Sequence, residues 1–217
     1  LQSGNVGFEQ HQIIPNITTN NNQWAYGKVK QFPVVPAKQT ENEILKGLPS
    51  AILKELAPIA EDVHLQTGEY LYQPDDVINY LYFPETAIIS DFQILEDGKT
   101  LEVAMIGREG VAGVASLFNS HSSPNWLQVS IPGKATRIDA KLFRSESNKY
   151  PILQTALFSY VNQYIAQISQ KVICNSHHSV EERLCCWLLM ISDRCGRTNL
   201  PLTQEQIAGF LGVHRPS

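Results

Sequence analysis

Hydrophobic and polar residues alternate in short runs between residues 62 and 139. The runs INYLYF, AIISDFQIL, TLEVAMI and NWLQVSI are each typical of a strand, because alternation with a period of two buries one face of a pleated chain. Turn residues, as in QPDD, FPET, EDGK, IGREG and IPGK, separate the runs at intervals of roughly 8 to 12 residues. This spacing predicts a small antiparallel β-roll or barrel, in which residues 96–99 form the clearest hairpin turn.

After Asp139 the apolar residues follow a helical period instead. The stretch PILQTALFSYVNQYIAQISQKVIC predicts a helix of roughly 24 residues, with Pro151 in the first turn, where the missing N–H costs little. Its apolar residues form two adjacent stripes. The first stripe comprises Leu153, Leu157, Tyr160 and Tyr164, and the second comprises Val161, Ile165, Ile168 and Val172.

Two apolar stripes on one helix predict two packing partners. One partner is the roll of the same chain. The other is most simply the same helix of a second chain, which would make the protein a homodimer. A single wide stripe that faces the core of a monomer is the alternative.

Two shorter helices are predicted by their end signals. In LPSAILKELAPIA, Ser50 is a candidate N-cap for a short helix that precedes the roll. In SVEERLCCWLLMISDRC, Ser179 and Glu182 have capping-box spacing, and Gly196 follows as a C-terminal stop.

The closing stretch LTQEQIAGFLGVHRPS has the features of a helix-turn-helix. Thr203 and Gln206 form a capping-box pair, so a helix is expected to start at Gln204. Ala208 permits close helix crossing, and Gly212, four residues later, permits a tight turn. The second helix of such a motif enters the DNA major groove. This spacing also occurs in ordinary helical hairpins.

These patterns divide the chain into four parts. Residues 1–42 are rich in Asn and Gln and lack periodicity, which predicts a flexible N-terminal arm. The β-roll covers residues 43–148, the dimerisation helix 149–175, and the helix-turn-helix domain 176–217. The fold class is therefore α+β.

Composition narrows the classes of function. The 217 residues carry a net charge of −4, so no chain-wide basic surface is expected. No apolar run approaches the roughly 20 residues of a membrane helix, and no secretory signal stands at the start, which favours a cytoplasmic protein without a membrane partner. The four cysteines suggest reduced thiols. No constellation of a nucleophile with a base indicates an enzyme.

From Leu48 to Ser217 the chain resembles the CRP/FNR superfamily of bacterial transcription regulators. The resemblance is carried by GEYLYQPDDVINYLYFPETAIIS, LEDGKTLEVAMIGREGVAGV and EERLCCWLLMISDRCG…LPLTQEQIAGFLGVHRPS. It implies a sensor roll, a long dimerisation helix and a C-terminal winged helix-turn-helix that binds double-stranded DNA. It also implies RNA polymerase as a partner.

The resemblance places the recognition helix at the very end of the sequence, so most of this helix is expected to be missing. An arginine at its start can read a guanine edge, and a serine can hold a phosphate. Pro216 departs from the acidic residue of the cAMP-type members. The residues expected to contact DNA are Thr203, Gln204, His214, Arg215 and Ser217.

The resemblance also raises the question of cyclic nucleotide binding. Members that bind cAMP hold the ribose with a glutamate and the phosphate with an arginine. Here Gly113 matches the glycine of that cassette, but Val114 replaces the glutamate, and no Arg or Lys lies between Glu109 and Lys134. Because a buried phosphate needs a cation, cAMP is not expected to bind. Arg108, Glu109, Gly113 and Val114 are the residues expected at a pocket for an unknown small-molecule effector.

Other cofactors of this superfamily are not expected either. An iron–sulfur sensor needs clustered N-terminal cysteines, and residues 1–173 contain none. Haem would need an axial ligand from the roll, where only His64 and His121 are candidates. No metal site is predicted. The alternative function is a ligand-binding or protein-interaction roll domain that no longer reads DNA.

Overall fold

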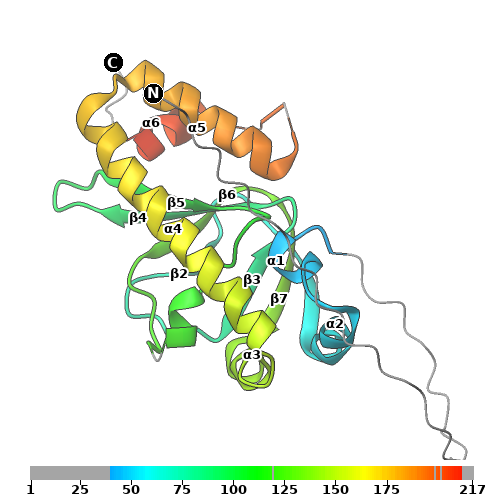
Figure 1. Ribbon diagram of the computed structural model, residues 1–217. Coiled ribbons are helices and arrows are strands. Elements are labelled where there is room, and N and C mark those ends of the chain that lie inside the picture. The colour runs from blue at the N-terminus through cyan, green and yellow to red at the C-terminus, as the bar shows by residue number, and fades with distance from the viewer. Residues whose placement is uncertain (1–39, 119, 198, 201, 212–217) are drawn as a thin grey trace, which may run out of the picture. The chain divides into compact units, whose positions relative to one another are not determined.

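The computed structural model describes residues 40–118, 120–197, 199–200 and 202–211 (Figure 1). Its strands form a three-stranded antiparallel sheet of order β1-β7-β3 and a four-stranded antiparallel sheet of order β2-β6-β4-β5. The α+β fold with an antiparallel roll is therefore confirmed. The strands are β1 Ala60–Leu65, β2 Tyr70–Tyr72, β3 Tyr80–Pro84, β4 Ile88–Ile94, β5 Thr100–Ile106, β6 Trp126–Ile131 and β7 Gly133–Asp139.

Six α-helices surround these sheets in the described part of the chain. Figure 1 shows α4 crossing the sheets, with α3 at one end of its course and α5 and α6 at the other. The helices are α1 Glu43–Lys46, α2 Ser50–Leu56, α3 Ala140–Ser147, α4 Pro151–His177, α5 Val180–Cys195 and α6 Gln204–Leu211, with the 3-10 turns η1 Ala57–Ile59 and η2 Val114–Phe118.

The apolar strand runs are confirmed as β3 to β6. The predicted hairpin is the β4–β5 connection, where Ile94 pairs with Thr100 and Gly98 takes a positive φ of 81°. The sequence pattern missed the three-residue strand β2 as well as β1 and β7, and all six residues of β1 pair with β7. Both β1 and β7 carry several polar residues at exposed or half-buried positions, so their apolar alternation is weak.

Three buried clusters hold the elements together. One lies between the roll, α1 to α3 and the first half of α4, around Phe83, Phe143 and Leu153. A second fills the space within the roll, around Ile89 and Val129. A third joins the roll to α5 and is described below.

Three details differ from the sequence-based predictions. The N-cap position of α2 is Pro49, with no side-chain cap, so Ser50 is the first helical residue rather than the cap. Helix α4 has 27 residues and continues to His177. Asn42, placed at the end of the predicted arm, is fully buried, whereas residues 1–39 lie outside the described part.

Asn42 anchors α1 to the roll. Its side-chain amide donates to the carbonyl oxygens of Pro84 at 2.9 Å and Gly110 at 2.8 Å. Its side-chain oxygen accepts from the backbone N–H groups of Ile44 and Leu45, which caps the helix. One buried residue thus satisfies four backbone groups.

Candidate DNA-binding region and its junction with the roll

Helix α5 begins and ends as its sequence predicts. The Ser179 hydroxyl accepts from the Glu182 N–H at 3.2 Å, and the Glu182 carboxylate accepts from the Ser179 N–H at 2.8 Å. Gly196 closes the helix in the left-handed conformation with φ 65°, which a glycine adopts without steric cost. The capping box and the glycine stop are confirmed.

Helix α6 also starts where predicted. The side chains of Thr203 and Gln206 form a reciprocal cap, with the Gln206 N–H donating to the Thr203 hydroxyl at 3.2 Å and the Thr203 N–H donating to Gln206 Oε1 at 2.9 Å. Arg183 of α5 donates to the carbonyl oxygen of Leu211 at 3.1 Å, which joins the two helices.

Only part of the predicted DNA contact surface can be placed. Thr203 and Gln204 are exposed at the start of α6. His214, Arg215 and Ser217 lie outside the described residues. The assignment of these five residues to DNA contact stays a prediction.

Helix α5 packs directly on the four-stranded sheet. Trp187, Ile191 and Cys195 are buried on one side of α5. They belong to one cluster with residues of β4, β5 and β6, namely Ile88, Met105 and Ile131. The first helix of the DNA-binding region is therefore docked on the roll by apolar burial.

A buried glutamate lies at the centre of this junction. Glu102 of β5 is 2% exposed and accepts from the Ser90 hydroxyl at 2.7 Å, Trp187 Nε1 at 2.9 Å and Lys171 Nζ at 3.2 Å. Burial raises the pKa of this carboxyl, and the Lys171 ammonium opposes that shift. One side chain thus connects β4, β5, α4 and α5.

Two further polar contacts join the helix-turn-helix region to the roll. Arg194 near the end of α5 forms an ion pair with Glu109 at 2.6 Å. Thr100, at the start of β5, donates from its hydroxyl to the carbonyl oxygen of Gly209 in α6 at 2.9 Å. These contacts hold the C-terminal end of α5 and helix α6 against the roll.

A second buried carboxylate links the roll to α4. Asp91 of β4 accepts a hydrogen bond from the Tyr164 hydroxyl, while its Oδ1 has no hydrogen-bond partner among the described residues. Desolvation raises the pKa of Asp91 to about 6, although the hydrogen bond from Tyr164 opposes the shift. This group therefore binds its proton more tightly in the folded state than in the unfolded chain.

The raised pKa predicts a specific pH dependence of stability. The Asp91 contribution is fully present below the unfolded pKa of 3.8 and is lost as pH rises through about 6. Relative to Asp91→Asn, the wild type is expected to lose roughly 2 to 3 kcal/mol of unfolding free energy between these values. Urea unfolding of both proteins at pH 4 and pH 7.5 measures the difference.

The exposed Asp193 supplies the control for this prediction. Asp193→Asn removes a carboxylate from the surface of α5 and tests the effect of the amide substitution itself. A pH dependence that is the same in Asp91→Asn and the wild type would contradict the assignment to Asp91.

The residues predicted at an effector pocket serve other contacts in the structure. Arg108 pairs with Glu43 of α1 at 3.4 Å, and Glu109 pairs with Arg194. Gly113 has φ +87°, and a Cβ there would lie 2.9 Å from the carbonyl oxygen of Tyr80, so the backbone requires a glycine. Val114 is the first residue of η2, and its side chain carries no charge.

The two apolar stripes of α4 are distinguished by burial. Leu153, Leu157 and Tyr160 are buried against the roll, and Tyr164 is half-buried. In the second stripe Ile165 and Val172 are 57% and 61% exposed, while Val161 and Ile168 are half-buried. The structure adds Phe158, which is 59% exposed and seven residues before Ile165.

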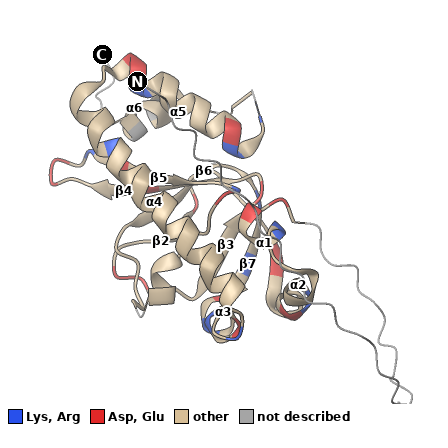
Figure 2. Ribbon diagram, in the orientation of Figure 1, with Lys and Arg blue, Asp and Glu red and all other residues tan. Residues whose placement is uncertain are grey.

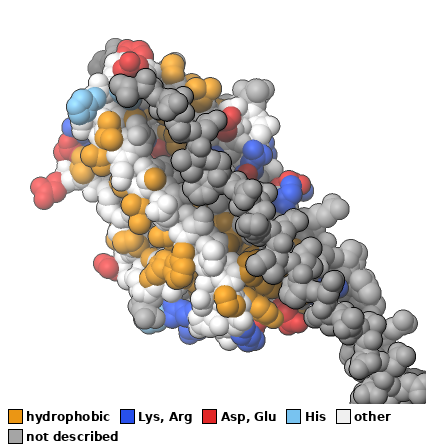
Figure 3. Space-filling model, in the orientation of Figure 1, with side chains coloured by type: hydrophobic (Ala, Val, Ile, Leu, Met, Phe, Trp, Pro, Cys, Tyr) orange, Lys and Arg blue, Asp and Glu red, His pale blue; other side chains and the backbone are white. Residues whose placement is uncertain are grey.

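The outer face of α4 is almost free of charge. Figure 2 shows the helix nearly uncoloured by charge, and Lys171 is its only Lys, Arg, Asp or Glu. Figure 3 shows hydrophobic side chains along the course of this helix. The exposed positions Phe158, Ile165 and Val172 follow a spacing of seven, which is the spacing of a coiled-coil seam.

Sequence reasoning missed Asp91, Glu102 and Lys171. Each is a charged residue inside an apolar run, in AIISDFQIL, TLEVAMI and YIAQISQKVIC respectively. A charge in the middle of such a run is the available signal, because a fully buried carboxylate or ammonium is rare without a partner. The partners themselves are distant in sequence and leave no local pattern.

Comparisons with known proteins agree with this architecture. A family model described as a cyclic nucleotide-binding domain matches residues 62–150, and a Crp-like helix-turn-helix domain matches residues 182–217. The two models in this order describe a domain of the cyclic nucleotide-binding type followed by a DNA-binding domain. The chain belongs to the CRP/FNR superfamily, and it is a DNA-binding transcription regulator. A search of curated proteins finds no significant match.

Solved structures share the fold at low sequence identity. The c-di-GMP-responsive global regulator CLP of Xanthomonas campestris is 15% identical, with a TM-score of 0.62 over 76% of this chain and 86% of that one. FixK2 of Bradyrhizobium japonicum is 17% identical, with a TM-score of 0.61 over 71% and 78%. A Crp/Fnr-family regulator from Eubacterium rectale is 13% identical, with a TM-score of 0.64 over 79% and 81%.

Among the described residues, no helix could span a membrane.

Proposed function

We propose that this regulator acts in the cytoplasm as a homodimer, without cAMP, and by binding rather than by catalysis. The main observation in favour of a homodimer is the uncharged, apolar outer face of α4. Phe158, Ile165 and Val172 recur every seven residues, with Val161 and Ile168 between them at the complementary spacing. Such a pattern fits a pair of helices packed along a common seam.

A two-fold symmetric dimer would present two helix-turn-helix motifs to DNA. The matching site is a near-palindrome whose half-sites are separated by about one helical turn of DNA, or roughly 34 Å. Because α5 adjoins α4 and also packs on the roll, a change at the α4 seam would alter the spacing of the two motifs. RNA polymerase is the further partner that the family implies.

The residues of the roll do not fit cAMP. Val114 offers no acceptor for a ribose hydroxyl, and no Lys or Arg lies between Glu109 and Lys134. The cations of neighbouring elements have other partners: Arg137 pairs with Glu61 at 2.6 Å, and Arg144 donates to the carbonyl oxygen of Ser116 in η2. A cyclic phosphate would therefore lose its hydration without gaining a counter-ion.

Calorimetric titration with cAMP and cGMP tests this part of the proposal. We expect no saturable heat from a chain whose folding is confirmed by circular dichroism. Micromolar binding of either nucleotide would contradict the proposal. Loss of that binding in Arg108→Gln would then identify Arg108 as the residue that holds the phosphate.

A further inference from the structure

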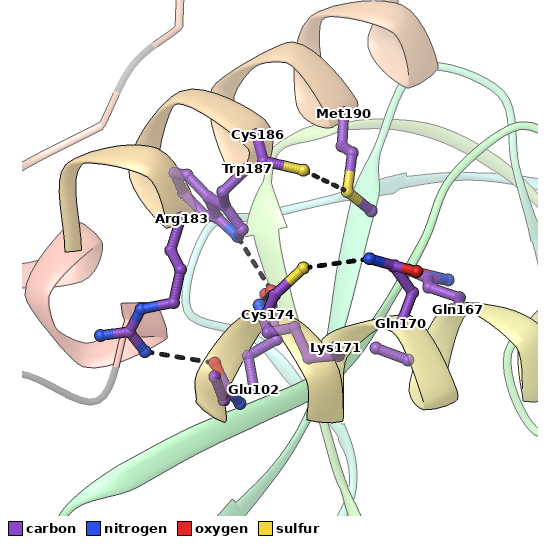
Figure 4. Close-up of a pocket in the computed structure, with 11 residues that line it drawn as sticks. Glu102, Gln167, Gln170, Lys171, Cys174, Arg183, Cys186, Trp187 and Met190 are labelled. Atoms are coloured by element: carbon purple, nitrogen blue, oxygen red, sulfur yellow. Dashed lines mark hydrogen bonds and ion pairs between the residues drawn. The ribbon is translucent and has the colours of Figure 1, made fainter. Parts of the chain in front are cut away.

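A cavity of about 230 Å³ lies between α4, α5 and β5. In Figure 4, Cys186 and Met190 extend from α5 toward side chains of α4, among them Gln170 and Cys174. Ala104 and Glu102 of β5 complete the lining. The cavity includes no residue of the 107–118 loop, so it is distinct from the effector position predicted from the sequence.

Of the charged groups that line this cavity, Glu102 and Lys171 neutralise each other, whereas Arg183 has no carboxylate partner in the described part of the chain. Glu102 is held by Lys171, and Arg183 Nη1 donates to Asn175 Oδ1 at 3.2 Å and to the carbonyl oxygen of Leu211. A cationic ligand would therefore lie beside an unneutralised positive charge and would lose its hydration without gaining a counter-ion. The cavity thus disfavours a cationic molecule.

The remaining lining favours an aromatic molecule. Trp187 supplies an indole ring, while Cys174, Cys186 and Met190 supply three sulfur atoms. Sulfur contacts aromatic rings favourably, and thioethers adapt to the shape of a ligand. A cavity of about 150 Å³ lined by apolar side chains accommodates benzene, so the larger cavity here has room for one or two rings.

One buried donor at this cavity lacks an acceptor. Arg183 Nε is buried and has no hydrogen-bond partner among the described residues, although the other end of the guanidinium is bonded. A buried N–H without an acceptor costs free energy that a ligand acceptor would recover. The ligand is therefore expected to carry a ring nitrogen or a carbonyl oxygen.

We propose that this cavity binds an aromatic molecule of one or two rings that carries a hydrogen-bond acceptor and no positive charge. Its walls come from the roll, the long helix and the first helix of the DNA-binding region, so a bound molecule would set the position of α5 on the roll. The consequence for DNA rests on the proposed function, whereas binding to the cavity does not.

Titration of the whole chain with quinoline tests the site. Quinoline is uncharged at pH 7.5, has two rings and carries a ring-nitrogen acceptor. We expect one site per chain by calorimetry, and at least about tenfold weaker binding of N-methylquinolinium, whose ring nitrogen cannot accept a hydrogen bond and whose positive charge would lie beside Arg183. Equal affinities for quinoline and N-methylquinolinium would overturn the inferred ligand class.

Two neighbouring cysteines of α5 provide a matched pair of variants. Both are exposed, but only Cys186 lines the cavity. Cys186→Phe should fill the space and weaken quinoline binding at least about tenfold, whereas Cys185→Phe should change it less than about twofold. Equal effects of the two substitutions would overturn the site.

A second copy of the chain is the competing occupant. If quinoline does not bind the wild type, and Cys186→Phe but not Cys185→Phe dissociates the dimer in sedimentation, the cavity is part of the contact between copies. That result overturns the ligand site and leaves the proposed homodimer standing.

Discussion

Replacing Glu102 with alanine is expected to lower the free energy of unfolding by about 3 kcal/mol. The substitution removes a side chain that is 2% exposed and accepts three hydrogen bonds, from Ser90, Trp187 and Lys171. Lys171 has a partly exposed side chain and can turn toward water. The Trp187 N–H is buried and would be left without this acceptor, and a cavity would replace the carboxylate.

Urea unfolding of Glu102→Ala and Glu102→Gln measures this effect. The glutamine variant keeps an acceptor for the indole and should lose about 1 kcal/mol. Glu96→Ala removes an exposed carboxylate from the β4–β5 turn and should change the unfolding free energy by less than about 0.5 kcal/mol. If Glu102→Ala were no more destabilising than Glu96→Ala, the junction would not depend on this residue.

Ile165→Glu is expected to dissociate the proposed dimer. Ile165 lies in the middle of the exposed apolar face of α4, and a two-fold axis would bring both copies of the new carboxylate into the seam. Burial of an unpaired charge costs several kcal/mol, so the dimer dissociation constant should rise at least about 100-fold. Sedimentation equilibrium over a range of concentrations measures this constant.

Ala166→Glu is the control for the charge. Ala166 is exposed on the same helix, but one residue along an α-helix turns the side chain by about 100° away from the seam. This variant should remain as dimeric as the wild type. Equal dissociation of both variants, or of neither, would place the contact between copies elsewhere.

The features that sequence predicted correctly are local ones. The capping boxes at Ser179 and Thr203 and the glycine stop at Gly196 each depend on residues within one helical turn. The two stripes of α4 depend on a period within a single helix. The residues within one or two helical turns are enough to predict these features, and tertiary contacts do not change them.

The junction between the roll and α5 could not be predicted in the same way. Trp187 and Glu102 are 85 residues apart, and so are Arg194 and Glu109. In sequence, Arg108 and Glu109 indicate a polar turn or an effector site, because their partners Glu43 and Arg194 are remote along the chain. Pairing at that distance depends on how the sheets and helices pack, which a hydrophobic pattern does not specify.

The burial of Asn42 limits how far the chain can be shortened from its N-terminus. Two of its four side-chain hydrogen bonds hold α1 against the strand that ends at Pro84 and against the turn at Gly110, and the other two cap α1. That turn also carries Glu109, the partner of Arg194 in α5. A shorter version that begins after Asn42 would leave the buried carbonyl groups of Pro84 and Gly110 without their donor, so a deletion series should keep Asn42.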